Sequence, residues 1–150
     1  SSDRHYAELK RVEGWERKAE YYRSTFCYEN ALFERALYYA RAAHQKNPTD
    51  TSISYHLSLC YNALGDKDHA LKVLKEVKAG LLDAPETRWL DYYRFTLERD
   101  AGRLAEASET LRKIPTDYFE NAEELEAALK FARAQKDLGL LRHLRSVPKS

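Results

Sequence analysis

The stretch AEYYRSTF at Ala19–Phe26 returns as LDYYRFTL at Leu90–Leu97, and this near-repetition decides the fold. The two copies align without a gap at an offset of 71 residues. A third related unit lies between them, because Ala70 follows Ala36 by 34 residues and precedes Ala107 by 37. Two offsets near 35 residues predict three helix–turn–helix units of about 34 residues, and units of that size bury their apolar faces only by stacking on neighbours.

Apolar residues follow a helical period through nearly the whole chain. Trp15, Ala19, Tyr22 and Phe26, for example, fall at i, i+4, i+7 and i+11, which is one face of a helix. No run alternates with a period of two, so the sequence predicts an all-α chain without strands.

Capping residues agree with this interpretation. Asp50 or Thr51 precedes one apolar run, Asp66 precedes another, and Thr116 or Asp117 precedes a later one. Side chains of these types accept hydrogen bonds from the free amides at helix starts.

Composition excludes several classes of protein. In 150 residues, 43% are hydrophobic and 33% charged, which is typical of one folded domain. A formal charge of +1 argues against a nucleic-acid binder, since such proteins carry a clear positive excess. No apolar run approaches the length of a transmembrane helix, so membrane insertion is not expected.

The location of the protein is left open by its sequence. The first residues lack the apolar run of a signal peptide. The two cysteines, Cys27 and Cys60, do not build a disulfide framework, which favours a reducing compartment such as the cytoplasm. Because the chain contains no Met, we expect it to be a piece of a longer protein.

Catalytic and metal-binding motifs are missing from the sequence. His56 and Cys60 lie four residues apart on one helix face, the spacing of half a zinc site or of a Cys–His dyad. No further ligand or base accompanies them, so we interpret them as a small buried thiol beside a surface imidazole. The sequence therefore predicts no enzymatic activity, no cofactor and no metal site.

The middle unit resembles the tetratricopeptide repeat (TPR) family, whose pattern is W-x2-L-G-x2-Y, then A-x3-F. It reads Ser54-x2-Leu57-Ser58-x2-Tyr61, then Ala70-x3-Leu74. The first unit reads Ala19-x2-Tyr22-Arg23-x2-Phe26, then Ala36-x3-Ala40, and the third reads Leu90-x2-Tyr93-Arg94-x2-Leu97, then Ala107-x3-Leu111.

The outer units depart from the TPR pattern in two ways. Ala19 to Ala36 and Leu90 to Ala107 each span 17 residues, against 16 from Ser54 to Ala70, so a turn one residue longer is expected. In addition, Arg23 and Arg94 stand in the slot of a small residue.

The resemblance implies a TPR-like α-solenoid of stacked antiparallel helix pairs within a single domain over 1–150. It has about three repeats, over 15–48, 49–83 and 86–115. The flanks are an N-terminal cap or truncated helix over 3–14 and a degenerate repeat or C-terminal cap over 117–147.

Tyrosine is unusually frequent in this chain, which contains 11 Tyr and 5 Phe. In TPR-like folds the first helices line a concave groove that holds a partner peptide, and Tyr and Arg are frequent hot-spot residues at interfaces. The groove positions implied by the resemblance are Arg17, Glu20, Tyr21, Ser24, Tyr28, Tyr55, His56, Leu59, Asn62, Arg88, Asp91, Tyr92, Phe95 and Arg99.

One TPR subfamily grips chaperone C-termini with a clamp of Lys, Asn and Arg. The corresponding positions here are Glu20, Ser24, His56, Arg88 and Tyr92. Only Arg88 fits, and Glu20 repels a carboxylate. Binding to chaperone tails is therefore disfavoured.

The expected function is a non-enzymatic module that binds a peptide or helix of a partner protein in the concave groove. Two alternatives stay open. One is a structural spacer within a larger TPR scaffold of secretion, export or assembly machinery, and self-association through its ends would support it. The other is a regulatory helical domain of a larger protein.

Overall fold

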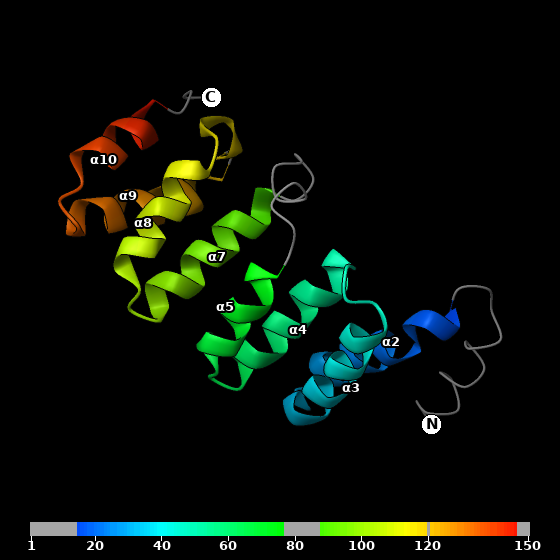
Figure 1. The fold of residues 1–150 in the computed structure, drawn as a ribbon. Helices are drawn as coiled ribbons and strands as arrows, with labels where there is room; N and C mark the ends of the chain where they lie inside the picture. Colours follow the sequence, from blue (N-terminus) through cyan, green and yellow to red (C-terminus); the bar gives the residue numbers. More distant parts are fainter. Residues whose placement is uncertain (1–14, 77–87, 120, 147–150) are drawn as a thin grey trace. The chain divides into compact units, whose positions relative to one another are not determined.

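A computed structural model describes residues 15–76, 88–119 and 121–146, and every regular element in these ranges is a helix (Figure 1). The all-α prediction is therefore confirmed for the described part of the chain. The predicted N-terminal cap over 3–14 lies outside it.

The chain forms two compact units, Ser1–Lys78 and Ala79–Ser150. The first contains α2 (Trp15–Glu29), α3 (Phe33–Lys46), α4 (Thr51–Ala63) and α5 (Lys67–Lys75). The second contains α7 (Arg88–Asp100), α8 (Leu104–Lys113), the short 3-10 helix η2 (Thr116–Tyr118), α9 (Ala122–Ala134) and α10 (Leu138–Arg145). Within each unit the helices pack as consecutive hairpins, with α3 against α4 in the first unit and α8 against α10 in the second.

One turn recurs in all four described hairpins. Its second residue has a positive φ each time: 60° at Ala31, 81° at Gly65, 78° at Gly102 and 54° at Lys136. These positions are 34, 37 and 34 residues apart, so the turns repeat the periodicity of the sequence. Glycine suits this left-handed conformation, and at two of the four turns another residue adopts it.

The hydrogen bonds of these turns are also the same. In the first turn the Leu32 amide donates to the Cys27 carbonyl at 2.8 Å and the Ala31 amide donates to the Tyr28 carbonyl at 3.0 Å. The other turns repeat this pair of bonds, which is the Schellman ending of a helix. All four turns contain three residues, so the longer turn predicted for the outer units is wrong.

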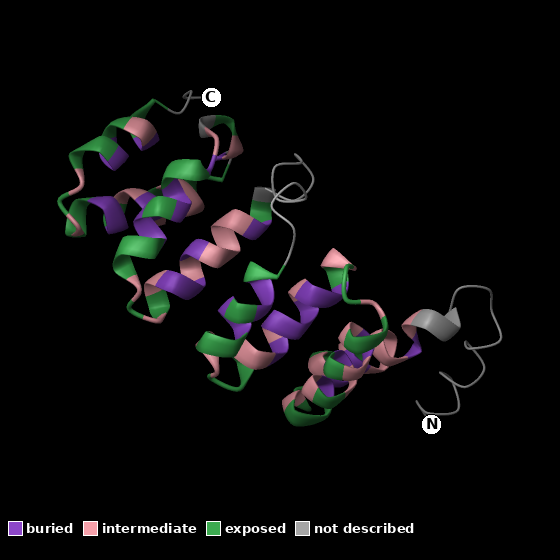
Figure 2. Ribbon diagram, in the orientation of Figure 1, coloured by how far each residue is buried: buried purple, intermediate pink, exposed green. Residues whose placement is uncertain are grey.

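Small residues allow the helices of each hairpin to approach closely. Ala36, Ala70 and Ala107 were expected at these positions, and all three have 0% exposure. Figure 2 shows the buried residues concentrated on the faces where paired helices meet. Ser24 and Ser58 reinforce the contact, because each hydroxyl donates to the carbonyl of the residue 12 positions later, at 2.6 and 3.1 Å.

Side-chain caps begin several helices. Asp50 and Asp66 accept from the amides of the third residue after them, as the sequence predicted. The third predicted cap is wrong, because Thr116 and Asp117 lie in η2. Asn121 caps α9 instead, accepting from the Glu123 amide at 2.8 Å.

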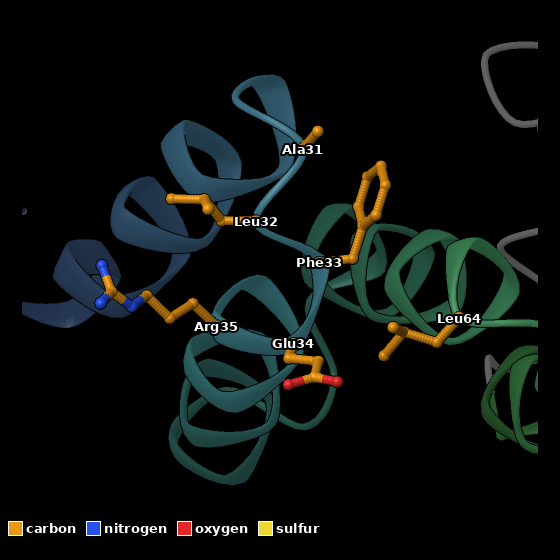
Figure 3. Close-up of a pocket in the computed structure, with 6 residues that line it drawn as sticks. All are labelled: Ala31, Leu32, Phe33, Glu34, Arg35 and Leu64. Atoms are coloured by element: carbon orange, nitrogen blue, oxygen red, sulfur yellow. The ribbon is translucent and has the colours of Figure 1, made fainter.

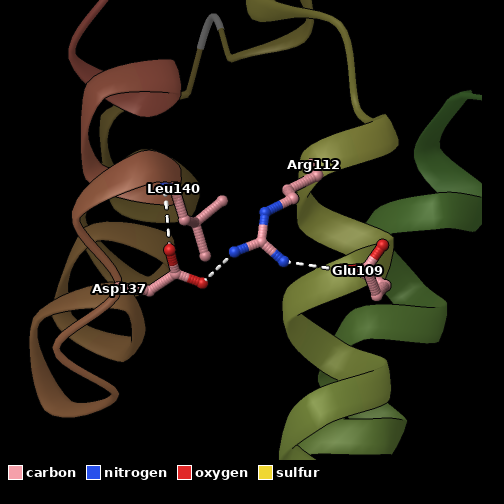
Figure 4. Close-up of polar contacts among 4 residues, drawn as sticks. All are labelled: Glu109, Arg112, Asp137 and Leu140. Atoms are coloured by element: carbon pink, nitrogen blue, oxygen red, sulfur yellow. Dashed lines mark hydrogen bonds and ion pairs between the residues drawn. The ribbon is translucent and has the colours of Figure 1, made fainter.

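An ion pair joins the two hairpins of the second unit (Figure 4). Arg112 of α8 contacts the Asp137 carboxylate at the start of α10, and its other terminal nitrogen lies 2.7 Å from Glu109. Asp137 also accepts from the Leu140 amide at 3.0 Å. The hydrogen bond from the Leu140 amide is the largest cause that lowers the pKa of Asp137, and Arg112 lowers it further. The carboxylate therefore stays ionised and accepts from both groups.

Candidate functional site

Three tyrosines of the predicted groove lie on neighbouring helices of the first unit. Tyr21 and Tyr28 extend from α2, and both rings contact the imidazole of His56 on α4, with centroids 5.5 and 5.6 Å from it. Tyr55 lies beside His56 in the chain. All three phenols are half-buried, so each ring keeps one accessible part.

Burial also changes the chemistry of two of these phenols. It is the largest cause that raises the pKa of Tyr21, and Asp50 adds to it while Lys18 opposes it. Burial, with a contribution from Tyr28, likewise raises the pKa of Tyr55. These side chains therefore remain neutral hydrogen-bond donors at physiological pH.

Beneath the tyrosines lies a buried polar network that joins α2, α3 and α4. The Ser24 hydroxyl donates to the Ala36 carbonyl at 2.6 Å, so its single proton is already used. His56 Nε2 lies 2.7 Å from the same oxygen and must therefore be the donor of that bond. This assigns the neutral His56 ring a proton on Nε2. Cys60 Sγ lies 3.6 Å from the same nitrogen.

This network is unsuited to nucleophilic catalysis. Burial lowers the pKa of His56, although hydrogen bonding to the backbone of Ser24 opposes the shift. Burial also raises the pKa of the Cys60 thiol to about 11, which suppresses the reactive thiolate. With Nε2 acting as a donor, His56 offers Ser24 no base. We conclude that Ser24, His56 and Cys60 serve to hold three helices together.

The structure corrects several groove assignments. Ser24, His56 and Phe95 are buried, so they belong to the core and not to an accessible surface. The expected surface imidazole at His56 is likewise wrong. For Ser24 and Phe95 the prediction was wrong by one residue along the helix. Each lies 12 residues before a buried alanine, as Ser58 does. They therefore occupy the position of close helix contact that the sequence analysis gave to Arg23 and Arg94. A one-residue error rotates a side chain by about 100° around the helix.

The other described groove residues of the first unit, Glu20, Leu59 and Asn62, are half-buried. Glu20 is paired with Lys46 at 2.6 Å. Leu59 and Asn62 are half-buried on α4, where the Asn62 side-chain oxygen accepts from Lys67 at 3.2 Å. Arg17 lies in α2, and its side chain is outside the described set.

The second unit holds a separate aromatic group. The Tyr92 ring stacks on Tyr118 with centroids 6.1 Å apart and meets Phe119 edge-on at 6.5 Å. The Arg99 guanidinium lies 5.3 Å from the centroid of Phe95 and pairs with Asp100 at 2.9 Å. Asp91 is half-buried, and the side chain of Arg88 is outside the described set.

Sequence reasoning missed Tyr118 and Glu124 in this group. A hydrogen bond from Tyr118 to Glu124 and burial both raise the pKa of that phenol, with burial the larger cause. The aromatic doublet Tyr118-Phe119, three residues after the breaker Pro115, is the signal that marks the segment as packed.

Sequence reasoning also missed a pocket at the tips of the first two hairpins (Figure 3). It has a volume of about 450 Å³ and is lined by Ala31, Leu32, Phe33, Glu34, Arg35 and Leu64. Leu32 and Leu64 are 44% and 40% exposed. In Figure 3 the side chain of Arg35 points away from Leu64, whereas the Glu34 carboxylate lies between them. The sequence does carry a signal for this pocket, because the apolar residues Leu32 and Leu64 lie inside the turns between helices.

Comparison with known proteins does not assign the chain to a family. No family model matches it, and no curated protein sequence matches it. Among the described residues, no three His, Cys, Asp or Glu side chains cluster closely enough to hold a metal ion. No helix in the same part of the chain has the length and apolar character needed to cross a membrane.

Proposed function

We propose that this chain is a TPR-like helical-repeat module that binds a segment of a partner protein without catalysing a reaction. The recurring turn supports the repeat architecture. It appears four times at spacings of 34, 37 and 34 residues, with the same hydrogen bonds, and the TPR unit is about 34 residues long. In such a solenoid the first helices of successive pairs share one face, here α2 with α4 in the first unit and α7 with α9 in the second.

The observation that carries the binding proposal is the group of half-buried rings on α2 and α4, which we call the tyrosine face: Tyr21, Tyr28 and Tyr55. Such rings offer a large apolar area together with a hydroxyl donor, and they lose little conformational entropy on binding. Contacts with His56 on the core side already hold Tyr21 and Tyr28 in place. A prearranged surface of this kind binds a helix or an extended peptide with apolar side chains.

Charge around the tyrosine face is balanced, which points to a partner held by apolar contact. Lys18 pairs with Asp50 at 3.4 Å, and Glu20 pairs with Lys46 at 2.6 Å. Pairs of opposite sign leave little net field for steering a charged partner. Affinity is therefore expected to fall less than about tenfold between roughly 50 and 300 mM salt.

The test compares partner capture by two immobilised variants from the native lysate. Tyr21→Ala with Tyr55→Ala removes two rings of the tyrosine face, while Tyr38→Ala removes a ring from α3 that is 71% exposed and lies outside it. Loss of one hot-spot ring costs about 2 kcal/mol, so the double variant should lose its partner at least about tenfold more than the control. Circular dichroism verifies that both variants fold.

Two other outcomes contradict the proposal. Equal retention of a partner by both variants places the binding surface elsewhere on the chain. No enriched partner for the parent chain or either variant favours the spacer function instead.

A further inference from the structure

The first unit has a second pocket, formed by α3, α4 and α5 and lined by none of the tyrosine-face residues. It has a volume of about 210 Å³, below the roughly 300–1,000 Å³ of sites for drug-sized ligands. Leu57 and Val73, both buried, supply apolar lining. The space suits one small polar group that carries a short organic substituent.

Positive charge predominates among the residues that line this pocket. Arg41 of α3 and Lys72 of α5 are exposed, and neither forms an ion pair with a described residue. Glu76 is the sole acidic lining residue, and it lies 3.4 Å from Nε2 of His44. With both lining imidazoles neutral, the formal charge of the lining is +1.

An aromatic pair provides a place for an organic substituent. The rings of Tyr61 and His69 stack with centroids 5.2 Å apart and planes 23° from parallel, and both line the pocket. The Asp66 carboxylate lies 2.7 Å from His69 Nδ1 and so restrains the imidazole on one side. A small apolar or aromatic group can pack against such a stack.

From this combination we propose that the pocket bounded by Arg41, Lys72 and the Tyr61–His69 stack binds a phosphomonoester. A guanidinium and an ammonium provide many donors and no acceptors, and a phosphomonoester offers them more acceptor oxygens and more negative charge than a carboxylate does. The site is independent of the tyrosine face, so it stands whether or not that face binds a partner.

Titration with phenyl phosphate tests the proposal, followed by backbone and side-chain NMR shifts of the whole chain. We expect saturable shifts at the lining residues of α3 and α5. Arg41→Gln and Lys72→Gln should each weaken binding about tenfold, the effect of losing one charge-assisted hydrogen bond. Glu76→Gln should strengthen binding about threefold, because it removes a negative charge from the lining.

The matched control is Arg35→Gln, which removes an exposed arginine on the same helix without touching this pocket. Its affinity for phenyl phosphate should equal that of the parent chain. A phosphotyrosyl peptide distinguishes the sources of the group: tighter binding than phenyl phosphate indicates a modified protein, and equal binding indicates a small metabolite. Either result supports the site.

Three results would overturn the proposal. The first is the absence of saturable shifts with phenyl phosphate. The second is equal weakening by Arg35→Gln and Arg41→Gln, since that would show a non-specific charge effect. The third is equal affinity for phenyl phosphate and benzoate, because the pocket would then not select phosphate.

Discussion

The hydrogen bond between Ser24 and His56 provides the sharpest prediction about the core of the first unit. Ser24→Ala removes the donation to the Ala36 carbonyl and leaves the buried His56 Nε2–H with only the weak acceptor Cys60 Sγ, 3.6 Å away. A lost hydrogen bond costs about 1 kcal/mol, and an unsatisfied buried donor costs a further 1–3 kcal/mol or so. We therefore expect the variant to lose about 2–4 kcal/mol in the free energy of unfolding of the first unit.

A double-mutant cycle isolates the bond itself. Because His56→Leu removes the donor that Ser24→Ala leaves unsatisfied, the double variant should be about 1–2 kcal/mol more stable than the two single losses predict. Thr25→Ala is the neighbouring control. It removes only a local bond to the Tyr22 carbonyl, and it should cost less than about 1 kcal/mol.

Hydrogen exchange read by mass spectrometry measures each unit separately, which matters because a chain of two units need not unfold in one transition. Peptides from α2 and α4 report the first unit, and peptides from α8 and α10 provide the internal reference. Strict additivity of the two single variants would refute the bond. So would a Ser24→Ala cost no larger than that of Thr25→Ala.

Three further predictions concern protons and turns. Burial lowers the pKa of His56 below its ordinary 6.5, so its contribution to stability is complete above that pH and is lost as the pH falls below it. Exchange rates of the α2 and α4 peptides should therefore show a larger loss of stability on acidification in the parent chain than in His56→Leu, and equal losses would contradict this. The pKa of Cys60 is about 11, so only about one thiol in a thousand is ionised at about pH 8. Mass spectrometry should find Cys60 unlabelled by a thiol reagent in the native chain and labelled in urea, and rapid native labelling would show that the thiol is accessible. Because Ala31 and Gly65 both have positive φ, Ala31→Gly should raise the urea midpoint of the first unit by an amount corresponding to about 1 kcal/mol, and Gly65→Ala should lower it similarly. A lower midpoint for Ala31→Gly would contradict a left-handed turn.

The repeat period and the class of secondary structure could be predicted from the sequence because they are encoded locally. The offset of 71 residues between the two tyrosine segments recurs in the structure: α2 ends at Glu29 and α7 at Asp100. The alanines expected at close helix contacts are buried because no larger side chain fits where paired helices touch.

The register of the outer hairpins was not predictable from residue type alone. Ser24 in the first hairpin is a small residue like Ser58, but Phe95 takes the corresponding place in the third. A large ring fits there because it packs edge-on against Phe131 of α9, at 5.2 Å, in the core of the second unit. Such a contact joins residues far apart in the chain, so a local pattern does not reveal it.

The turn between α9 and α10 could not be predicted from the sequence for a different reason. Lys136 adopts the left-handed conformation that glycine adopts at Gly65 and Gly102, so the usual sequence signal is missing there. Likewise, the bond from His56 to Ser24 spans 32 residues, and no spacing rule predicts it. These are consequences of packing between helices, which the pattern within one helix does not specify.

The proposed binding of a protein segment by the tyrosine face is tested most directly by site-specific photo-crosslinking. A benzophenone side chain is placed at position 21 or 55, with position 38 on α3 as the control, and the folded chain is irradiated in native lysate. We predict one shared crosslinked protein from positions 21 and 55 that is missing from position 38. The same crosslinked protein from position 38 at equal yield, or none from positions 21 and 55, would contradict the account.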